Sequence, residues 1–226
     1  MTTCPRIEGL PREMVALRVS REIPDGAYVN LGIGIPTLIS DWIAGRDIVL
    51  HSEIGMLKTG PLAGEGEADQ DRINASCQAV CELPGCSYCD IAESFAMMRG
   101  GHLDIAVMGA LQVNARGDYA GWLNPSRGLD VGNIGGSMDL CAGAKRLFLA
   151  MEHVTNHGEL KIVNELTYPA TAEGKVDMIF TDLAVMEVTP EGLLLREVMP
   201  GLTPEDVQAV TGPKLIISPD LKDIEL

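Results

Sequence analysis

The sequence predicts an α/β protein with a mixed, largely parallel β-sheet flanked by helices. Three observations indicate this class. Several apolar runs are continuous, as in strands that are buried on both faces. Residues 28–52 have the order strand, loop, helix and strand, which is typical of a parallel βαβ unit. The later apolar runs have few helical segments between them, so we expect some antiparallel pairs as well.

The chain is long enough for one substantial hydrophobic core. Its 226 residues are 46% hydrophobic, and a single domain over residues 1–226 is the simplest organisation. No apolar run approaches the ~18 residues of a membrane span, and the first residues lack the basic and apolar regions of a signal peptide. We therefore expect a cytoplasmic protein without a membrane anchor.

The charge is strongly acidic. Seventeen lysines and arginines against 32 aspartates and glutamates give a formal net charge of -15. A nucleic-acid surface needs clustered positive charge, so this balance argues against a nucleic-acid partner. Any anionic ligand must then be held by local groups.

The first elements follow from periodicity and from helix-stop residues. Residues 10–23 are predicted to form an amphipathic helix that ends before Pro24. A strand follows over residues 28–32, a helix is predicted over 36–45, and a second strand covers 47–52. These segments make up the βαβ unit.

A right-handed crossover makes its two strands parallel, so their carboxyl ends lie at the same edge of the sheet. Ligands of open α/β sheets bind at that edge. The glycine loop at residues 32–34 follows the first strand, and Glu53 follows the second. We therefore expect the loop and the Glu53 carboxylate to face one crevice.

The rest of the chain supplies the other strands and a short helix. The helix is predicted over residues 203–212, with Thr203 as its N-cap and Gly212 as its stop. Strands are predicted at residues 102–113, 146–152, 161–166, 177–188, 192–198 and 214–218.

The glycine loop, NLGIGIP, invites comparison with dinucleotide-binding motifs. The third glycine of the G-x-G-x-x-G pattern would fall on Thr37, which argues against a nicotinamide cofactor. Gly32 and Gly34 allow a ligand to approach the backbone closely, with Asn30 bonding to it. A tight turn without a ligand explains the same glycines.

A second glycine motif, GNIGGSMDLCAGA, places Gly135 and Gly136 before a helix predicted to begin near Ser137. Free backbone N–H groups at such a start can bind an anion or an oxyanion. A plain capping turn is the alternative. We interpret His51 and His102 as structural residues.

Four of the six cysteines fall within CQAVCELPGCSYC: Cys77, Cys81, Cys86 and Cys89. Their spacing does not give two C-x-x-C pairs, and the segment is too short to place ligands on two separate ribbons. We therefore expect no metal site and interpret them as reduced thiols.

Taken together, the motifs resemble those of one family. The sequence is similar to the B, or beta, subunit of a 3-oxoacid CoA-transferase of the succinyl-CoA:acetoacetate type. The resemblance runs from about Arg12 to about Ser218. It includes NLGIGIP, HSEIGM, PGCSYCDIAESFAMMRGGHLDIAVMGALQV, GDYAGW, GGSMDLCAGA, AMEH, TDLAV and VTPEGL.

This resemblance implies a three-layer CoA-transferase-like fold and a role for each motif. Glu53 would be the nucleophile, because it matches the glutamate of the family's Ser-Glu-x-Gly motif. Gly135 and Gly136 would help to form the oxyanion hole. The glycine loop, with Asn30, Gly32 and Gly34, would lie at the CoA site.

Two departures from the family pattern bear on the substrate. Ile54 stands where the family usually has an asparagine, so a hydrogen bond from that amide is missing. Cys86 and Cys89 stand where small and aromatic residues are more usual beside the active site, so we expect them to alter the acyl pocket.

The implied reaction moves CoA from an acyl-CoA to a free carboxylic acid through a covalent glutamyl-CoA thioester. It needs no metal, redox cofactor or ATP. A CoA-ester hydrolase, including ring-opening types, is the alternative on the same fold, because a lone glutamate can also act as a general base. A non-catalytic subunit, or a metal- or redox-sensing module built on the cysteines, is a third possibility.

The resemblance covers only the beta half of the two-part transferase. We therefore expect an alpha subunit of similar size as partner, in an assembly of two alpha and two beta chains. The acids are not specified by the sequence: acetoacetate, longer 3-oxo acids, 3-oxoadipate and simple fatty acids all fit. A role in ketone-body or fatty-acid metabolism follows from the resemblance alone.

Overall fold

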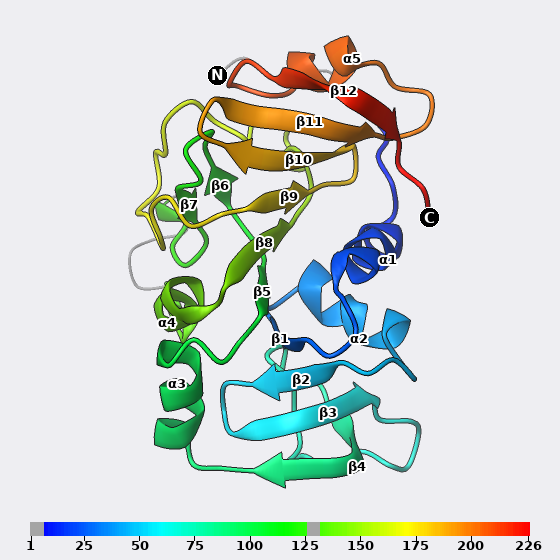
Figure 1. Cartoon of the computed structure of the whole chain (residues 1–226), viewed down its shortest axis with the longest axis vertical. Helices are drawn as coiled ribbons and strands as arrows, with labels where there is room; N and C mark the ends of the chain where they lie inside the picture. The colour runs from blue at the N-terminus through cyan, green and yellow to red at the C-terminus, as the bar shows by residue number, and fades with distance from the viewer. Residues whose placement is uncertain (1–6, 126–131) are drawn as a thin grey trace.

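The computed structural model describes residues 7–125 and 132–226. Within these ranges one large sheet has the strand order β12-β11-β10-β9-β8-β5-β1-β2-β3-β4 (Figure 1). Its strands are β1 (Tyr28–Leu31), β2 (Val49–Ser52), β3 (Met56–Leu62), β4 (Val80–Tyr88), β5 (Ile105–Met108), β8 (Arg146–Ala150), β9 (Met178–Phe180), β10 (Ala184–Thr189), β11 (Gly192–Val198) and β12 (Ile216–Asp223). A small sheet pairs β6 (Gln112–Val113) with β7 (Tyr119–Ala120).

The large sheet is parallel in its centre and mostly antiparallel toward its ends. The five central strands, β9, β8, β5, β1 and β2, are mutually parallel. β3 and β4 continue the sheet antiparallel on one side, as do β10 and β11 on the other, and β12 pairs parallel with β11. The predicted mixed, largely parallel sheet is confirmed.

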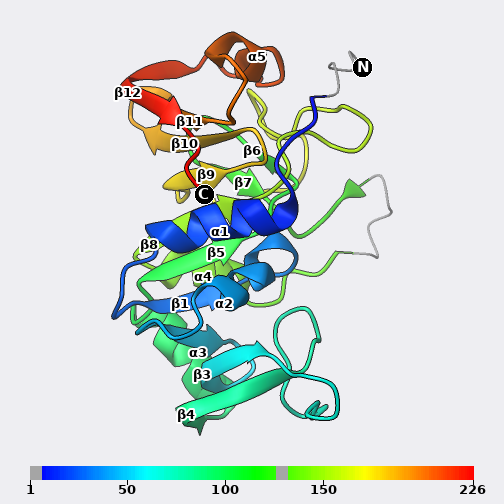
Figure 2. The same cartoon turned by 90° about the vertical axis from the view of Figure 1, so that its right-hand side faces the viewer.

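Helices cover both faces of the sheet and give it three layers. α1 (Arg12–Glu22), η1 (Ile35–Leu38) and α2 (Ile39–Trp42) lie on one face, and α3 (Ile91–Arg99) and α4 (Ser137–Gly143) lie on the other (Figures 1 and 2). A short helix, α5 (Pro204–Ala209), lies beside β11 near the edge of the sheet. Among the described residues no helix has the length and apolar character needed to cross a bilayer.

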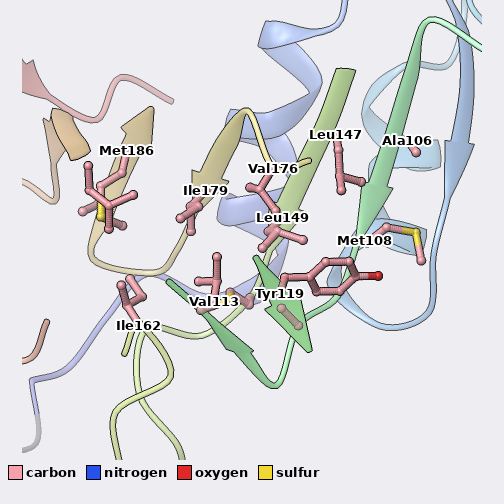
Figure 3. Close-up of a cluster of buried hydrophobic side chains, with 14 of the residues drawn as sticks. Ala106, Met108, Val113, Tyr119, Leu147, Leu149, Ile162, Val176, Ile179 and Met186 are labelled. Carbon is pink, nitrogen blue, oxygen red and sulfur yellow. The ribbon is translucent and has the colours of Figure 1, made fainter. Parts of the chain in front are cut away.

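Alternate residues of the central strands supply the two cores. Ile105 and Val107 of β5 pack toward α1, while Ala106 and Met108 pack toward α4. On the second face the small sheet also takes part, and Figure 3 shows Val113 and Tyr119 against the side chains of β8 and β9. Continuous apolar strands are therefore explained by burial on both faces.

Several predicted elements are confirmed with small shifts. α1, β1, β2, β8 and β11 lie where the sequence places them, and α4 begins at Ser137 as predicted. α5 has the predicted cap: the Thr203 side chain accepts the N–H of Asp206, whose carboxylate accepts the N–H of Thr203. The helix predicted over 36–45 is shorter, and it begins as a 3-10 turn at Ile35.

Three strand predictions were wrong in extent. Residues 102–113 do not form one strand, because the chain leaves the large sheet after Met108 and enters the small one. Residues 177–188 split at Thr181, whose hydroxyl accepts the N–H groups of Leu183 and Ala184 and thereby closes a turn. Residues 161–166 hold only a single bridge, between Ile162 and Val113.

Candidate active site

A cavity of about 510 Å³ lies at the carboxyl ends of β1, β2 and β5. The predicted crevice is confirmed, because the glycine loop after β1 and Glu53 after β2 both line it. The diglycine segment closes it from the side of α4. Its lining residues include Asn30, Gly32, Ile33, His51, Ser52, Glu53, Met108, Tyr119, Trp122, Asn133, Gly135, Gly136 and Ser137.

Glu53 is held in a tight turn between β2 and β3. Ser52 pairs with Met56, and the N–H of Gly55 donates to the carbonyl of Ser52 at 3.0 Å. Gly55 has φ 115°, and a Cβ at this position would overlap the carbonyl oxygen of Cys89. Only glycine fits such a close approach with positive φ. Gly55 therefore fixes the path of the chain directly after Glu53.

The Glu53 carboxylate faces the first residues of α4. The N–H of Gly136 lies 3.4 Å from Oε1 of Glu53. A Cβ at Gly136 would lie 2.6 Å from Oε2 of Glu53 and 3.2 Å from the ring of Phe95. Gly135 has φ 48°, which favours glycine. The diglycine segment thus brings a backbone donor close to a carboxylate that lies in a cavity.

The two glycines of the loop have different structural causes. A Cβ at Gly32 would lie 3.2 Å from the carbonyl oxygen of Val107, so Gly32 permits close packing of the loop against β5. Gly34 has φ 92° with open space around it, and it does not line the cavity. The exposed side chain between them, Ile33, stands at the cavity. A tight turn explains Gly34, whereas Gly32 and Asn30 reach the cavity.

Behind Glu53 lies a buried polar network. Asn30 and His51 are paired across β1 and β2, and the Asn30 amide lies 3.0 Å from Nδ1 of His51. Nε2 of His51 is 2.9 Å from the hydroxyl of Ser94 on α3. Burial lowers the pKa of His51. His51 is therefore a buried, hydrogen-bonded residue, as predicted, although it also lines the cavity.

The sequence analysis missed Ser94 and Phe95, which lie on α3. Ser94 is fully buried and bonds to His51, and Phe95 packs beside Gly136. The available signal was Asp90, which caps α3 by accepting the N–H of Glu93. An acidic cap before an apolar run predicts a helix, but it does not reveal which residues this helix contacts.

The cysteines lie away from the cavity. Cys81 and Cys86 are on β4, Cys77 precedes it and Cys89 follows it. None of the four lines the cavity, contrary to the expectation that Cys86 and Cys89 alter the acyl pocket. Burial raises the pKa of both thiols. Among the described residues no cluster of three or more His, Cys, Asp or Glu side chains is arranged to hold a metal; another cysteine, at position 4, lies outside them.

Positive charge is missing from the described walls of the cavity, which contain no lysine or arginine. A second cavity, of about 790 Å³, adjoins the first at Ala110 and Leu111. It contains Arg12 and Lys161, and both form ion pairs with Glu152. The described part of the chain therefore offers little uncompensated positive charge near Glu53.

The sequence matches the family model "Coenzyme A transferase" over residues 12–209. It is 49% identical over 208 residues to the B (beta) subunit of 3-oxoadipate CoA-transferase from Acinetobacter baylyi, covering 92% of this chain and 95% of that protein. It is 40% identical to the B (beta) subunit of succinyl-CoA:3-ketoacid coenzyme A transferase from Helicobacter pylori, covering 88% of this chain and 96% of that protein.

Solved structures share the fold at lower sequence identity. Acyl-CoA transferase from Escherichia coli O157:H7 superposes with a TM-score of 0.75 at 20% identity, over 98% of this chain and 44% of that one. Glutaconate coenzyme A-transferase from Acidaminococcus fermentans gives a TM-score of 0.67 at 16% identity, over 95% and 88% of the two chains. The decarboxylase AibA/AibB gives 0.70 at 22% identity, over 97% and 90%. At these identities the likeness concerns the fold alone.

Proposed function

Because the chain belongs to the coenzyme A transferase family and is one part of a CoA-transferase, we propose that Glu53 is the nucleophile of its reaction. The observation that carries this proposal is the Glu53 carboxylate, in a cavity at the ligand edge, 3.4 Å from the N–H of Gly136. The proposed reaction moves CoA from an acyl-CoA to a second carboxylic acid. The comparisons do not favour a hydrolase.

In the first step an oxygen of Glu53 attacks the thioester carbonyl and forms a tetrahedral intermediate. The C–S bond breaks, and CoA leaves as a thiolate from the resulting acyl-glutamyl anhydride. The thiolate then attacks the carbonyl carbon of Glu53, which releases the first acid and leaves a glutamyl-CoA thioester. A second carboxylate reverses these steps, so no net proton transfer is needed.

The first step is uphill, because a thiol is a weaker acid than a carboxylic acid by about four pKa units, or roughly 6 kcal/mol. A backbone donor that meets the oxyanion contributes about 3–4 kcal/mol. In our proposal Gly136 is that donor, with Gly135 setting its direction. Binding energy from the distant part of CoA supplies the remainder, since it can be realised as the reacting atoms meet.

We propose that a second, different subunit completes the site. The described walls of the cavity carry no lysine or arginine, whereas CoA is strongly anionic and this chain has a net charge of -15. The names of the relatives describe each as the B (beta) subunit of its enzyme. An alpha subunit of similar size, in an assembly of two alpha and two beta chains, would supply the missing positive charge.

The substrates we propose are a succinyl-CoA donor and a 3-oxo acid acceptor. Names of relatives at 40–49% identity support this class, and 3-oxoadipate is the acid in the name of the relative at 49%. Asn30, Gly32 and Ile33 line the cavity and would contact the acyl-CoA. We propose no cofactor besides CoA itself, and a cytoplasmic location stays a prediction.

The test uses the chain co-expressed and purified with its alpha subunit. Incubation with succinyl-CoA alone should leave a CoA-sized mass on the peptide that contains Glu53, and acid product should accumulate only when a 3-oxo acid is added as acceptor. Turnover without any adduct would rule out the covalent mechanism. Acyl-CoA loss that does not depend on an acceptor would point to hydrolysis.

A further inference from the structure

Three buried side chains form a continuous chain of hydrogen bonds behind the turn that carries Glu53. Asn30, His51 and Ser94 are 3%, 4% and 0% exposed. They come from three elements, β1, β2 and α3, and the chain of bonds ends at the carbonyl of Ser52, which lies 3.5 Å from the Ser94 hydroxyl. That carbonyl belongs to the peptide group that joins Ser52 to Glu53.

The contacts determine the direction of every bond. The Asn30 amide nitrogen lies 3.0 Å from the backbone carbonyl of His51, which can only accept, so this atom is the NH2 group. The same nitrogen lies 3.0 Å from Nδ1 of His51, so Nδ1 accepts. In the neutral ring the proton is then on Nε2, which donates to the Ser94 hydroxyl at 2.9 Å. The hydroxyl is left to donate to the carbonyl of Ser52.

The helix that carries Ser94 also contacts the opposite wall of the site. Phe95 packs against Gly136, and Arg99 at the end of α3 pairs with Asp139 of α4 at 2.6 Å. α3 therefore connects the peptide group before Glu53 to the helix whose first N–H groups face the Glu53 carboxylate. A change in its position changes the distance between nucleophile and donor.

We propose that His51 and Ser94 are positioning residues, which hold the Ser52–Glu53 peptide so that the Glu53 carboxylate meets the acyl-CoA beside Gly136. This inference rests on the proposed function of Glu53. Neither residue exchanges a proton with the substrate; both act through the backbone of the strand end. Misplacement of a reacting group by about 1 Å can cost about 100-fold in rate.

The chain contains a matched control in His153. This histidine is also fully buried and also bridges two side chains, with Nδ1 at 2.9 Å from the hydroxyl of Thr181 and Nε2 at 2.9 Å from that of Thr211. It does not line the cavity. Loss of this bridge should affect folding alone, which separates positioning from general stability.

The experiment compares His51→Leu, Ser94→Ala, the double variant, His51→Gln and His153→Leu in the complex with the alpha subunit. Three quantities are measured: the single-turnover rate of the CoA adduct on Glu53, the kcat and KM of transfer, and the melting temperature. His51→Leu and Ser94→Ala should each slow adduct formation and kcat by about 10- to 100-fold, with KM for the acyl-CoA little changed.

The double variant should be no slower than the slower single variant, because both remove one chain of contacts. His51→Gln keeps a donor for Ser94 and should regain most of the rate. His153→Leu should lower the melting temperature and leave the kcat of the folded complex unchanged. Ser94→Ala removes a single oxygen and decides the question by itself if His51→Leu does not fold.

Additive losses in the double variant, an equal loss of kcat in His153→Leu, or wild-type adduct rates in Ser94→Ala would each overturn the inference. Failure of the proposed function has a different signature. In that case the wild-type complex itself forms no adduct on Glu53, whatever the variants do.

Discussion

Two carboxylates occupy equivalent places in this fold, and only one is placed for chemistry. Glu53 follows β2 and Asp182 follows β9, two strands of the parallel centre, so both lie past the carboxyl ends at the same edge. Asp182 accepts the N–H of His153 at 2.7 Å, lies against Gly9, and lines neither cavity. Glu53 lines the first cavity and faces a backbone donor of α4. Position at the edge therefore does not suffice; access and unused bonding capacity make the difference.

The strongest test of this comparison removes the charge at both places. Glu53→Gln should lower kcat of the complex by at least about 1000-fold with an unchanged melting temperature, because the nucleophile is lost and the turn stays intact. Asp182→Asn keeps an oxygen for the His153 N–H and should change kcat by less than about threefold. Similar losses in both variants would remove the distinction between the two strand ends.

The end of β9 should matter for stability instead. Phe180 is fully buried directly before Thr181, and its ring lies 5.5 Å from that of Phe148. Phe180→Ala should cost about 3–5 kcal/mol in the free energy of unfolding, since a large buried ring is lost. Urea unfolding of the purified complex measures it, and the kcat per folded complex should stay at the wild-type value. A selective loss of kcat would assign β9 a role in the reaction.

A smaller effect is expected from the wall opposite Glu53. Gly136→Ala places a methyl group against the Glu53 carboxylate and the Phe95 ring, so the carboxylate must move. We expect kcat to fall by about 10- to 100-fold. Gly45→Ala is the control, because Gly45 has φ 81° and open space, so it should lose only stability. The prediction fails if both variants leave the adduct rate unchanged.

The smallest expected effect concerns pH. Burial raises the pKa of Asp182. A carboxyl group whose pKa is raised by folding favours the folded state at pH values below its ordinary pKa of about 3.9, and this contribution is lost as the pH rises through the raised pKa. Asp182→Asn removes that loss. Melting temperatures at pH 4 and 7 should show the variant gaining stability relative to the wild type; a relative loss would contradict the burial argument.

The sequence predicted the part of the fold that depends on local pattern and strand polarity. The βαβ unit, the parallel centre and the convergence of the glycine loop with Glu53 follow from apolar runs and the handedness of the crossover. β3 and β4 were missed because they lie at the end of the sheet: most of β4 is exposed, and its residues include Pro84 and Gly85. Their pairing is decided by neighbouring strands rather than by composition.

The site was predictable in its reacting group and less so in its support. Glu53 could be placed from the end of one strand, but the bond from His51 to Ser94 joins residues 43 positions apart. Gly32 shows the same limit. Its glycine was interpreted through a ligand, whereas the carbonyl of Val107, on a strand far along the chain, demands it as well. Single-sequence patterns do not contain such distant contacts.

The separation between Glu53 and Gly136, 83 residues, also has a consequence for synthesis. At about 5–20 residues per second, roughly 4 to 17 s pass on the ribosome between the nucleophile and its backbone donor. β1 and β2 can pair early, but β5 lies between β1 and β8 in the sheet and is made later. During that interval the nascent chain has a carboxylate without an oxyanion donor opposite it, so it cannot consume acyl-CoA before the sheet is assembled.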